Sequence, residues 1–231
     1  MKRHGWILLP LLLALFLLLW APCRTLYAEE KGENRIRFHW AFGAMVGPEG
    51  DRRVVSITRD TALKTGDRIK MLLELQSKCF VYLFYCTGED NWYLLFPYTL
   101  DQFEKDYEIA RRYYIPQGDR WFELDEQLGM ETFYLLAASQ RFTKLERLYG
   151  DYSAASDAKR KELGKQILNE IRSIKKQHRK LTASAERPVP IGGNLRGTGK
   201  GPQKGLPDLD PIATEVSAGN FYSRTFTIDH R

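Results

Sequence analysis

Three carboxylic acids lie close together in the sequence: Asp125, Glu126 and Glu131. Paired carboxyl groups can supply the acid and the base of a hydrolytic reaction, so this group is the first candidate for catalysis. The same residues surround Gly129 between two apolar runs, and Asp and Gly are typical turn residues. We therefore expect these carboxylates to support a turn. The alternative, a hydrolase site, requires a pocket that gathers Asp125, Glu131 and a histidine.

Three histidines and two cysteines follow residue 28: His39, His178, His230, Cys79 and Cys86. No histidine has a carboxylate or a cysteine at a spacing typical of metal ligands, so we expect surface histidines. The two cysteines flank a strand-like run, which would hold them on the order of 20 Å apart. A disulfide needs Cα atoms within roughly 7 Å, so the cysteines are predicted to be small buried apolar residues.

Motifs of known catalytic machinery are absent from the sequence. There is no nucleophile elbow, no helical zinc-protease motif and no pair of Cys-x-x-Cys motifs. Gly199-Lys200 resembles part of a phosphate-binding loop. That loop requires glycine at position 194 and serine or threonine at 201, where the chain has Asn194 and Gly201. We predict no catalytic residue, no metal ligand and no cofactor.

Apolar runs, several of them with a period of two, predict a series of strands between residues 36 and 137. In residues 36–42 every second side chain is large and apolar: Ile36, Phe38, Trp40 and Phe42. Further strands are predicted at 53–58, 69–75, 79–86, 92–96, 121–124 and 132–137. The run 79–86 is apolar on both faces, which is typical of a central strand covered on both sides.

Helices are predicted after residue 142. Thr143 and Glu146 have the spacing of a capping box, in which both side chains bind backbone amides at a helix start. A longer helix is expected at about 154–182, with an apolar stripe along one side: Leu163, Ile167, Ile171 and Ile174.

The Gly- and Pro-rich segment 187–220 is predicted to be a flexible loop, and 221–229 a returning last strand. The expected fold is mainly β (α+β): an antiparallel β-sandwich-like domain with a C-terminal helical insertion. We expect one domain over 29–231, with its core at 35–140 and its helices at about 143–182.

The helix at 154–182 is strongly basic, with nine Lys or Arg residues against three acids between 157 and 180. Its exposed cations could contact anionic lipid, envelope polysaccharide or an acidic protein. The residues proposed for such a contact are Lys161, Lys165, Arg172 and Lys176. The alternative is that these side chains are only the solvated face of a helix that covers a sheet.

The first 28 residues have the pattern of a hydrophobic leader. Lys2 and Arg3 precede an apolar run over residues 6–21, and Ala28 offers a cleavage site. A spanning helix needs about 20 apolar residues, so a cleaved signal peptide is favoured over an uncleaved membrane anchor. Both interpretations predict export to the periplasm or cell surface.

The charge of the exported chain is modest. Without residues 1–28 it has 32 basic and 29 acidic residues, a net charge near +3. A nucleic-acid-binding face normally needs a larger local excess of cations, so we predict no nucleic-acid partner.

A series of short motifs resembles a known bacterial family. In order they are Leu63-x-x-Gly66-Asp67, Tyr82-Leu83-Phe84, Leu95-Phe96-Pro97, Ile115-Pro116, Phe122-x-Leu124-Asp125 and Gly129-x-Glu131. Over residues of about 55–140 the chain is similar to the bacterial domain of unknown function 4384. The resemblance implies an exported accessory domain, found elsewhere beside signalling kinases or caspase-like peptidases, and it supplies no catalytic residues.

Together these patterns predict a non-enzymatic, exported binding or interaction module of the bacterial cell envelope. Its expected partners are an envelope protein or an anionic envelope surface, and also the membrane through residues 6–21 if the leader is retained. The alternative is a periplasmic hydrolase whose site is assembled from scattered residues.

Overall fold

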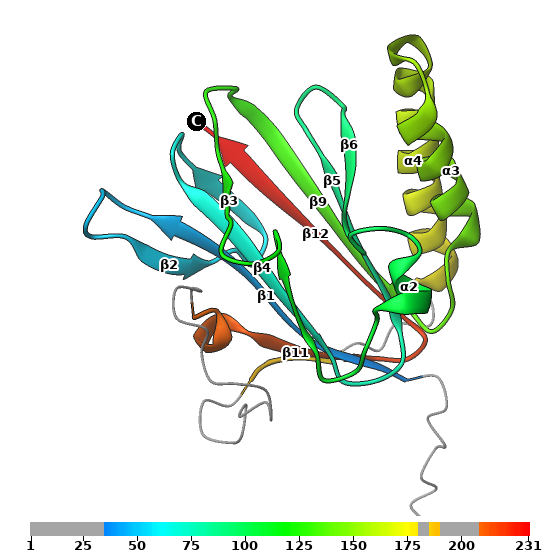
Figure 1. Cartoon of the computed structure of the whole chain (residues 1–231), viewed down its shortest axis with the longest axis horizontal. Helices are drawn as coiled ribbons and strands as arrows, with labels where there is room; N and C mark the ends of the chain where they lie inside the picture. The colour runs from blue at the N-terminus through cyan, green and yellow to red at the C-terminus, as the bar shows by residue number, and fades with distance from the viewer. Residues whose placement is uncertain (1–34, 180–184, 190–207) are drawn as a thin grey trace, which may run out of the picture. The chain divides into compact units, whose positions relative to one another are not determined.

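Two β-sheets face each other, and a pair of helices covers the outer side of one of them (Figure 1). The computed structural model describes residues 35–179, 185–189 and 208–231. The predicted leader, and with it the boundary at residue 28, lies outside these ranges. The described part is mainly β with an α-helical insertion near the C-terminus, which confirms the predicted fold class.

The first sheet, sheet A, has seven strands. Its main path runs β10 (Ala185–Pro188), β11 (Thr214–Ala218), β1 (Ile36–Val46), β4 (Arg68–Leu75) and β7 (Arg112–Ile115). Two short strands complete it: β2 (Arg53–Ser56) pairs with β1, and β8 (Phe122–Glu123) pairs with β4.

The second sheet, sheet B, has five strands. Their order is β3 (Asp60–Leu63), β12 (Phe221–His230), β9 (Gly129–Ala138), β5 (Phe80–Cys86) and β6 (Trp92–Phe96). All pairs are antiparallel except β3 with β12. The last strand therefore lies inside sheet B, between the short β3 and the long β9.

The main core fills the space between the sheets, where the alternating apolar residues point. On β1 the four predicted side chains are all buried: Ile36, Phe38, Trp40 and Phe42. Phe42 meets Phe133 and Phe226 of sheet B in edge-to-face contacts, with ring centroids 5.1 and 5.3 Å apart. Such aromatic pairs add to the free energy gained from burial alone.

Strand β5 is covered on both sides, as its sequence predicts. Val81 and Leu83 point into the core between the sheets, whereas Tyr82 and Phe84 point towards the helices. All four side chains are fully buried. A two-sided strand of this kind fixes the position of both apolar layers.

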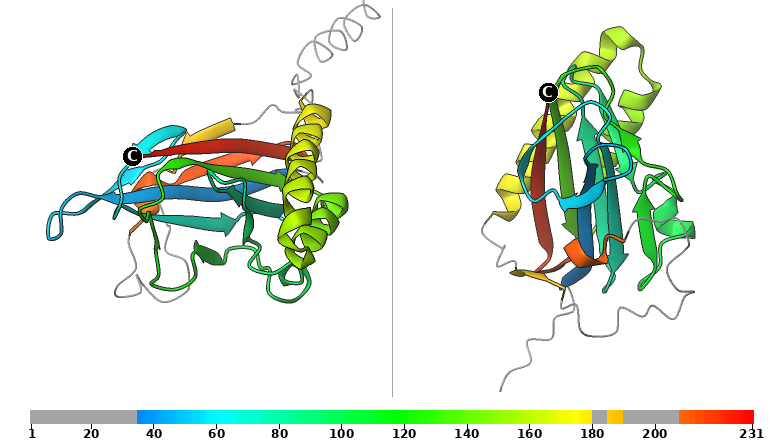
Figure 2. Two further views of the ribbon diagram at one scale, coloured as in Figure 1. Left: turned by 90° about the horizontal axis from the view of Figure 1, so that it is seen from above. Right: turned by 90° about the vertical axis from the view of Figure 1, so that its left-hand side faces the viewer.

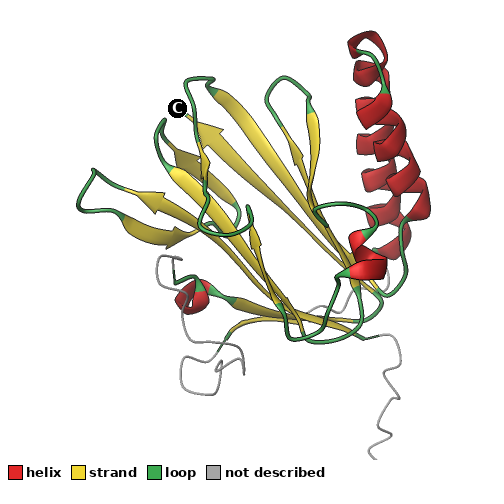
Figure 3. Ribbon diagram, in the orientation of Figure 1, coloured by secondary structure: helices red, strands yellow, loops and turns green. Residues whose placement is uncertain are grey.

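The helices form a third layer over sheet B (Figures 2 and 3). Helix α3 spans Thr143–Ala154 and α4 spans Asp157–His178, while the one-turn α2 (Gln102–Lys105) precedes β7. Ile167, Ile171 and Ile174 of α4 are buried against sheet B, which confirms the predicted stripe, and Leu163 is partly buried beside them.

The capping-box prediction for α3 is wrong. Phe142 is the N-cap residue, and its side chain makes no capping hydrogen bond. The Glu146 carboxylate instead turns to Tyr82 and Arg141. A tertiary cation and a buried hydroxyl are stronger partners for a carboxylate than the N–H groups of its own first turn.

The segment predicted as a loop over 187–220 is not a loop throughout. Thr214–Ala218 form β11, which pairs with β1, and a 3₁₀ turn, η1, spans Asp210–Ile212. Leu209 and Ala213 pack with Ala41 on the outer face of sheet A. Apart from Val189 and the strand residues before it, the first part of the segment lies outside the described residues. The high Gly and Pro content of the segment as a whole predicted a loop, so the strand β11 near its C-terminal end was missed.

Candidate functional site

All four cations predicted as an anionic-surface contact are exposed on α4: Lys161, Lys165, Arg172 and Lys176. Each residue of an α-helix advances by about 100°, which places these four within an arc of about 60°. The buried Ile167 and Ile171 lie on the opposite side of the helix. We call the four exposed cations the basic stripe.

The acidic residues of α4 fall outside the basic stripe. Glu170 forms an ion pair with Lys144 of α3, and Asp157 pairs with Arg160 at 3.2 Å. Glu162 lies at least 40° from every member of the stripe by the same helical geometry. All residues of α4 are described, and no acidic residue of this helix lies within the arc of the basic stripe.

The carboxylates at 125–131 are separated by the structure. The Asp125 carboxylate accepts a hydrogen bond from the Gln127 backbone N–H at 2.9 Å, which confirms its turn role. Glu126 is exposed on the same loop. Glu131 lies inside β9 and is only 8% exposed, so its predicted role in the turn is wrong.

Glu131 contributes to a pocket between the sheets. The cavity measures about 140 Å³ and has four residues from each side: Ile69, Phe122, Glu123 and Leu124 near sheet A, and Tyr85, Leu95, Glu131 and Phe133 in sheet B. Neither Asp125 nor any histidine belongs to this lining, so the set required for the hydrolase alternative does not assemble there.

Tyr85 and Glu131 form a buried pair in this pocket. The tyrosine hydroxyl donates to Glu131 Oε2 over 2.6 Å. Burial raises the pKa of Tyr85 above its ordinary value, and the hydrogen bond to Glu131 adds to that rise. No Lys, Arg or His nitrogen of the described residues lies within 4.0 Å of the Glu131 carboxylate as an ion-pair partner.

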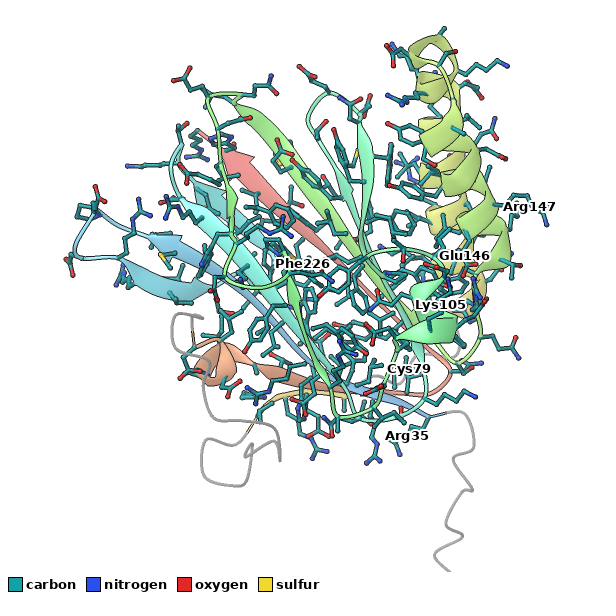
Figure 4. The ribbon with its side chains drawn as sticks, in the orientation of Figure 1. Arg35, Cys79, Lys105, Glu146, Arg147 and Phe226 are labelled. Atoms are coloured by element: carbon teal, nitrogen blue, oxygen red, sulfur yellow. The ribbon has the colours of Figure 1, made fainter. Side chains whose placement is uncertain are left out.

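A second Tyr–Glu pair lies on the opposite face of β5. Tyr82 donates to Glu146 Oε1 at 2.5 Å, and Arg141 donates to both carboxylate oxygens at 2.9 and 2.6 Å. Arg141 also pairs with Glu104 at 2.8 Å. In Figure 4, Glu146 points into the layer between α3 and sheet B, whereas the neighbouring Arg147 projects outwards. The sequence analysis missed both pairs.

The surface prediction for the histidines is wrong for His230. Strand β12 extends to this residue, and the alternation that buries Ile228 also turns His230 inwards, so that only 3% of it is exposed. Its Nε2 lies 3.1 Å from the Thr65 hydroxyl. His39 and His178 are half-buried. Among the residues that the structure describes, no His, Cys, Asp or Glu side chains gather as metal ligands.

Cys79 and Cys86 are buried free cysteines, as predicted. Burial raises the pKa of each thiol to about 12. Both thiols are therefore protonated at neutral pH, and a protonated thiol is a poor nucleophile.

Lys70 is a further buried charge that the sequence analysis did not single out. It lies on β4, fully buried, and its ammonium group donates to the carbonyl oxygens of Gly118 and Arg120, each at 2.5 Å. The rings of Tyr114 and Trp121 lie 5.6 and 5.7 Å from the nitrogen. Burial lowers the pKa of Lys70 to about 8. These contacts hold the loop after β7 against sheet A.

Comparison with known proteins supports the resemblance inferred from the motifs. Residues 62–141 match the family model of a domain of unknown function (DUF4384), which confirms that prediction. The match covers β4 to β9 and includes both tyrosines of β5. No curated protein and no solved structure is detectably similar to the chain.

Proposed function

We propose that this chain is a non-enzymatic, exported module of the bacterial cell envelope that binds an anionic membrane surface through α4. The observation that carries the proposal is the basic stripe: four exposed cations within about 60° of arc, opposite the buried isoleucines of the same helix. Export is supported by the pattern of the first 28 residues, in which Lys2 and Arg3 precede an apolar run.

Charge complementarity favours an anionic bilayer as the surface. Each Lys or Arg close to an acidic membrane contributes roughly 1 kcal/mol, so four aligned cations support measurable binding. The first and last residues of the stripe are 15 residues apart in the sequence, or about 22 Å along the helix, which allows all four to approach one flat surface. None of the described helices is apolar and long enough to cross a membrane. The proposed contact is electrostatic and lies on the membrane surface.

The hydrolase alternative has weaker support. The pocket lining includes two carboxylates, but Glu123 is engaged by Arg68 at 2.7 Å and Glu131 by Tyr85. A nucleophile–base pair needs side chains within hydrogen-bonding reach of each other. No Ser, Cys or His belongs to the lining.

Vesicle co-sedimentation tests the proposal with the chain from Glu29 onwards. We expect binding to vesicles that contain acidic lipid at low salt, little binding to neutral vesicles, and loss of binding as salt increases. Reversal of the stripe to Glu (Lys161, Lys165, Arg172 and Lys176) should abolish this binding.

A matched control keeps the net charge change the same. Reversal of four exposed cations elsewhere to Glu (Arg53, Arg59, Lys64 and Lys78) should retain most of the binding. Equal losses in both variants would mean that only net charge matters. If the unaltered chain does not bind acidic vesicles at low salt, the proposal is wrong and α4 only covers sheet B.

A further inference from the structure

The Glu131 carboxylate lies beside the cavity, in a residue that is only 8% exposed. One oxygen accepts from the Tyr85 hydroxyl, and within the described residues no cation reaches the group. Removing a carboxylate from water is costly unless hydrogen bonds and an opposite charge compensate. Glu146, which is equally buried, has that compensation from Arg141. Among the described residues Glu131 has no corresponding cation, and it lines a cavity.

We propose that this cavity binds a cationic group, an ammonium or guanidinium, at the end of an apolar stem. The cation would take the place at Glu131 that Arg141 occupies at Glu146. The proposal is independent of the basic stripe, because it concerns a different surface and the opposite charge.

The walls of the cavity fit such a group. Ile69, Leu95 and Leu124 provide apolar contacts for the stem. The rings of Tyr85 and Phe133 stack with centroids 4.8 Å apart, and Tyr93 extends the stack at 5.7 Å from Tyr85. The stacked rings add further apolar surface to this wall. An anion would be repelled by Glu131, and a neutral apolar group would give its carboxylate no counter-charge.

The size of the cavity limits the ligand to a small group. Its volume of about 140 Å³ is well below the roughly 300–1,000 Å³ of pockets that enclose a whole small molecule. A single lysine or arginine side chain is of suitable size, as is one end of a free diamine. The shared chemistry is a cation on an apolar stem, and the two sources can be distinguished by experiment.

Methyl NMR of the full-length chain in neutral detergent tests the proposal, because Ile69, Leu95 and Leu124 place labelled methyl groups in the wall. The probes are N-acetyl-lysine amide, N-acetyl-arginine amide, cadaverine and the neutral N-acetyl-norleucine amide. We expect saturable shifts of these methyl signals with at least one cationic probe and none with the neutral probe. Tighter binding of cadaverine indicates a free amine, and tighter binding of a capped amino acid indicates a partner's side chain.

Glu131→Gln is the decisive variant. Glutamine keeps an acceptor for the Tyr85 hydroxyl, so the fold should persist, and the remaining methyl signals report this directly. Loss of a charged partner should weaken binding of the cationic probe by at least about tenfold. Glu126→Gln, which removes an exposed carboxylate outside the lining, should bind as the unaltered chain does.

Three outcomes would overturn the proposal. The pocket methyl groups show no saturable shift with any cationic probe, or the neutral probe binds equally well, or Glu131→Gln binds as tightly as the unaltered chain. None of these outcomes bears on vesicle binding by α4, so failure of one proposal leaves the other intact.

Discussion

Strand β5 carries two tyrosines whose hydroxyls each donate to a buried glutamate, and the two pairs differ in one respect. On the helix side, Tyr82 and Glu146 are joined by Arg141, which donates to both carboxylate oxygens. On the side between the sheets, Tyr85 and Glu131 have no such cation among the described residues, and a cavity lies beside them.

If the proposal for the cavity holds, similar chemistry serves structure in one place and binding in another. The donors to Glu146 are Tyr82 of β5 and Arg141, which precedes α3. Their hydrogen bonds hold the start of α3 against β5. The Tyr82 hydroxyl also accepts from the Phe142 backbone N–H at 3.1 Å. Around Glu131 the same requirement for a counter-charge is left to a ligand. The following predictions test this contrast.

The largest effect is expected from Arg141→Met. Methionine cannot donate to Glu146, which leaves a buried carboxylate without its cation. Loss of one partner from a buried pair costs about 3–5 kcal/mol. Because Arg141 is 27% exposed, we expect a loss of roughly 2–4 kcal/mol in the free energy of unfolding, measured in urea. Arg147→Met, at an exposed position of α3 next to Glu146, is the control and should change stability by less than about 0.5 kcal/mol. A loss below about 1 kcal/mol at Arg141 would show that Glu146 does not depend on the ion pair.

The two tyrosines should respond differently to loss of the hydroxyl. Tyr82→Phe removes a hydroxyl that is hydrogen-bonded to both the Glu146 carboxylate and the Phe142 N–H. The loss should cost about 1–3 kcal/mol, because buried polar groups are left unsatisfied. Tyr85→Phe removes one hydrogen bond to a carboxylate beside a cavity, where water can replace the hydroxyl, and should cost about 1 kcal/mol or less. Urea unfolding of both variants gives the comparison. Equal losses would contradict the view that the second pair is incomplete.

Much of the fold could be predicted from the sequence, because burial follows the period of the apolar residues. The two apolar faces of 79–86 identified β5, and the isoleucines of α4 identified its buried stripe. The Tyr–Glu pairs could not be predicted, because each joins residues more than 40 positions apart. The predictions of a surface position for His230 and a turn position for Glu131 were wrong for the same reason. Each residue lies near the end of a strand that extends further than the apolar pattern in the sequence.

Lys70 is a third buried charged residue, and it should make the stability of the protein depend on pH. Its pKa is about 8 in the folded chain, below the ordinary value of 10.5. Between these values the unfolded chain binds more protons than the folded chain, so stability should rise with pH, by at most about 1.4 kcal/mol per pH unit for one group. Asp119 acts against this lowering of the pKa, and Arg120 acts with it.

The measurement compares urea unfolding of the unaltered chain and Lys70→Met from pH 7.5 to 9.5. Cys79 and Cys86 act in the opposite direction in both proteins, because burial raises each thiol pKa from 9.0 to about 12. The contribution of Lys70 is therefore expected as a difference in stability between the two proteins that changes with pH. Above about pH 10 the buried tyrosines act in the opposite direction, because their raised pKa values keep them protonated only in the folded state. A parallel dependence in the two proteins would show that Lys70 titrates normally.

The smallest effect is expected at Glu131 itself. Glu131→Gln retains an acceptor for Tyr85 and removes a buried charge that has no cation among the described residues. The weaker hydrogen bond is therefore offset by relief of desolvation. We expect the free energy of unfolding to change by less than about 1 kcal/mol, in either direction, in contrast to the loss at Arg141. A loss above about 2 kcal/mol would mean that the chain itself completes the Glu131 site as Arg141 completes that of Glu146. In the expected case, a cationic probe raises the melting temperature of the unaltered chain and has no such effect on Glu131→Gln, because a ligand stabilises only the folded state that binds it.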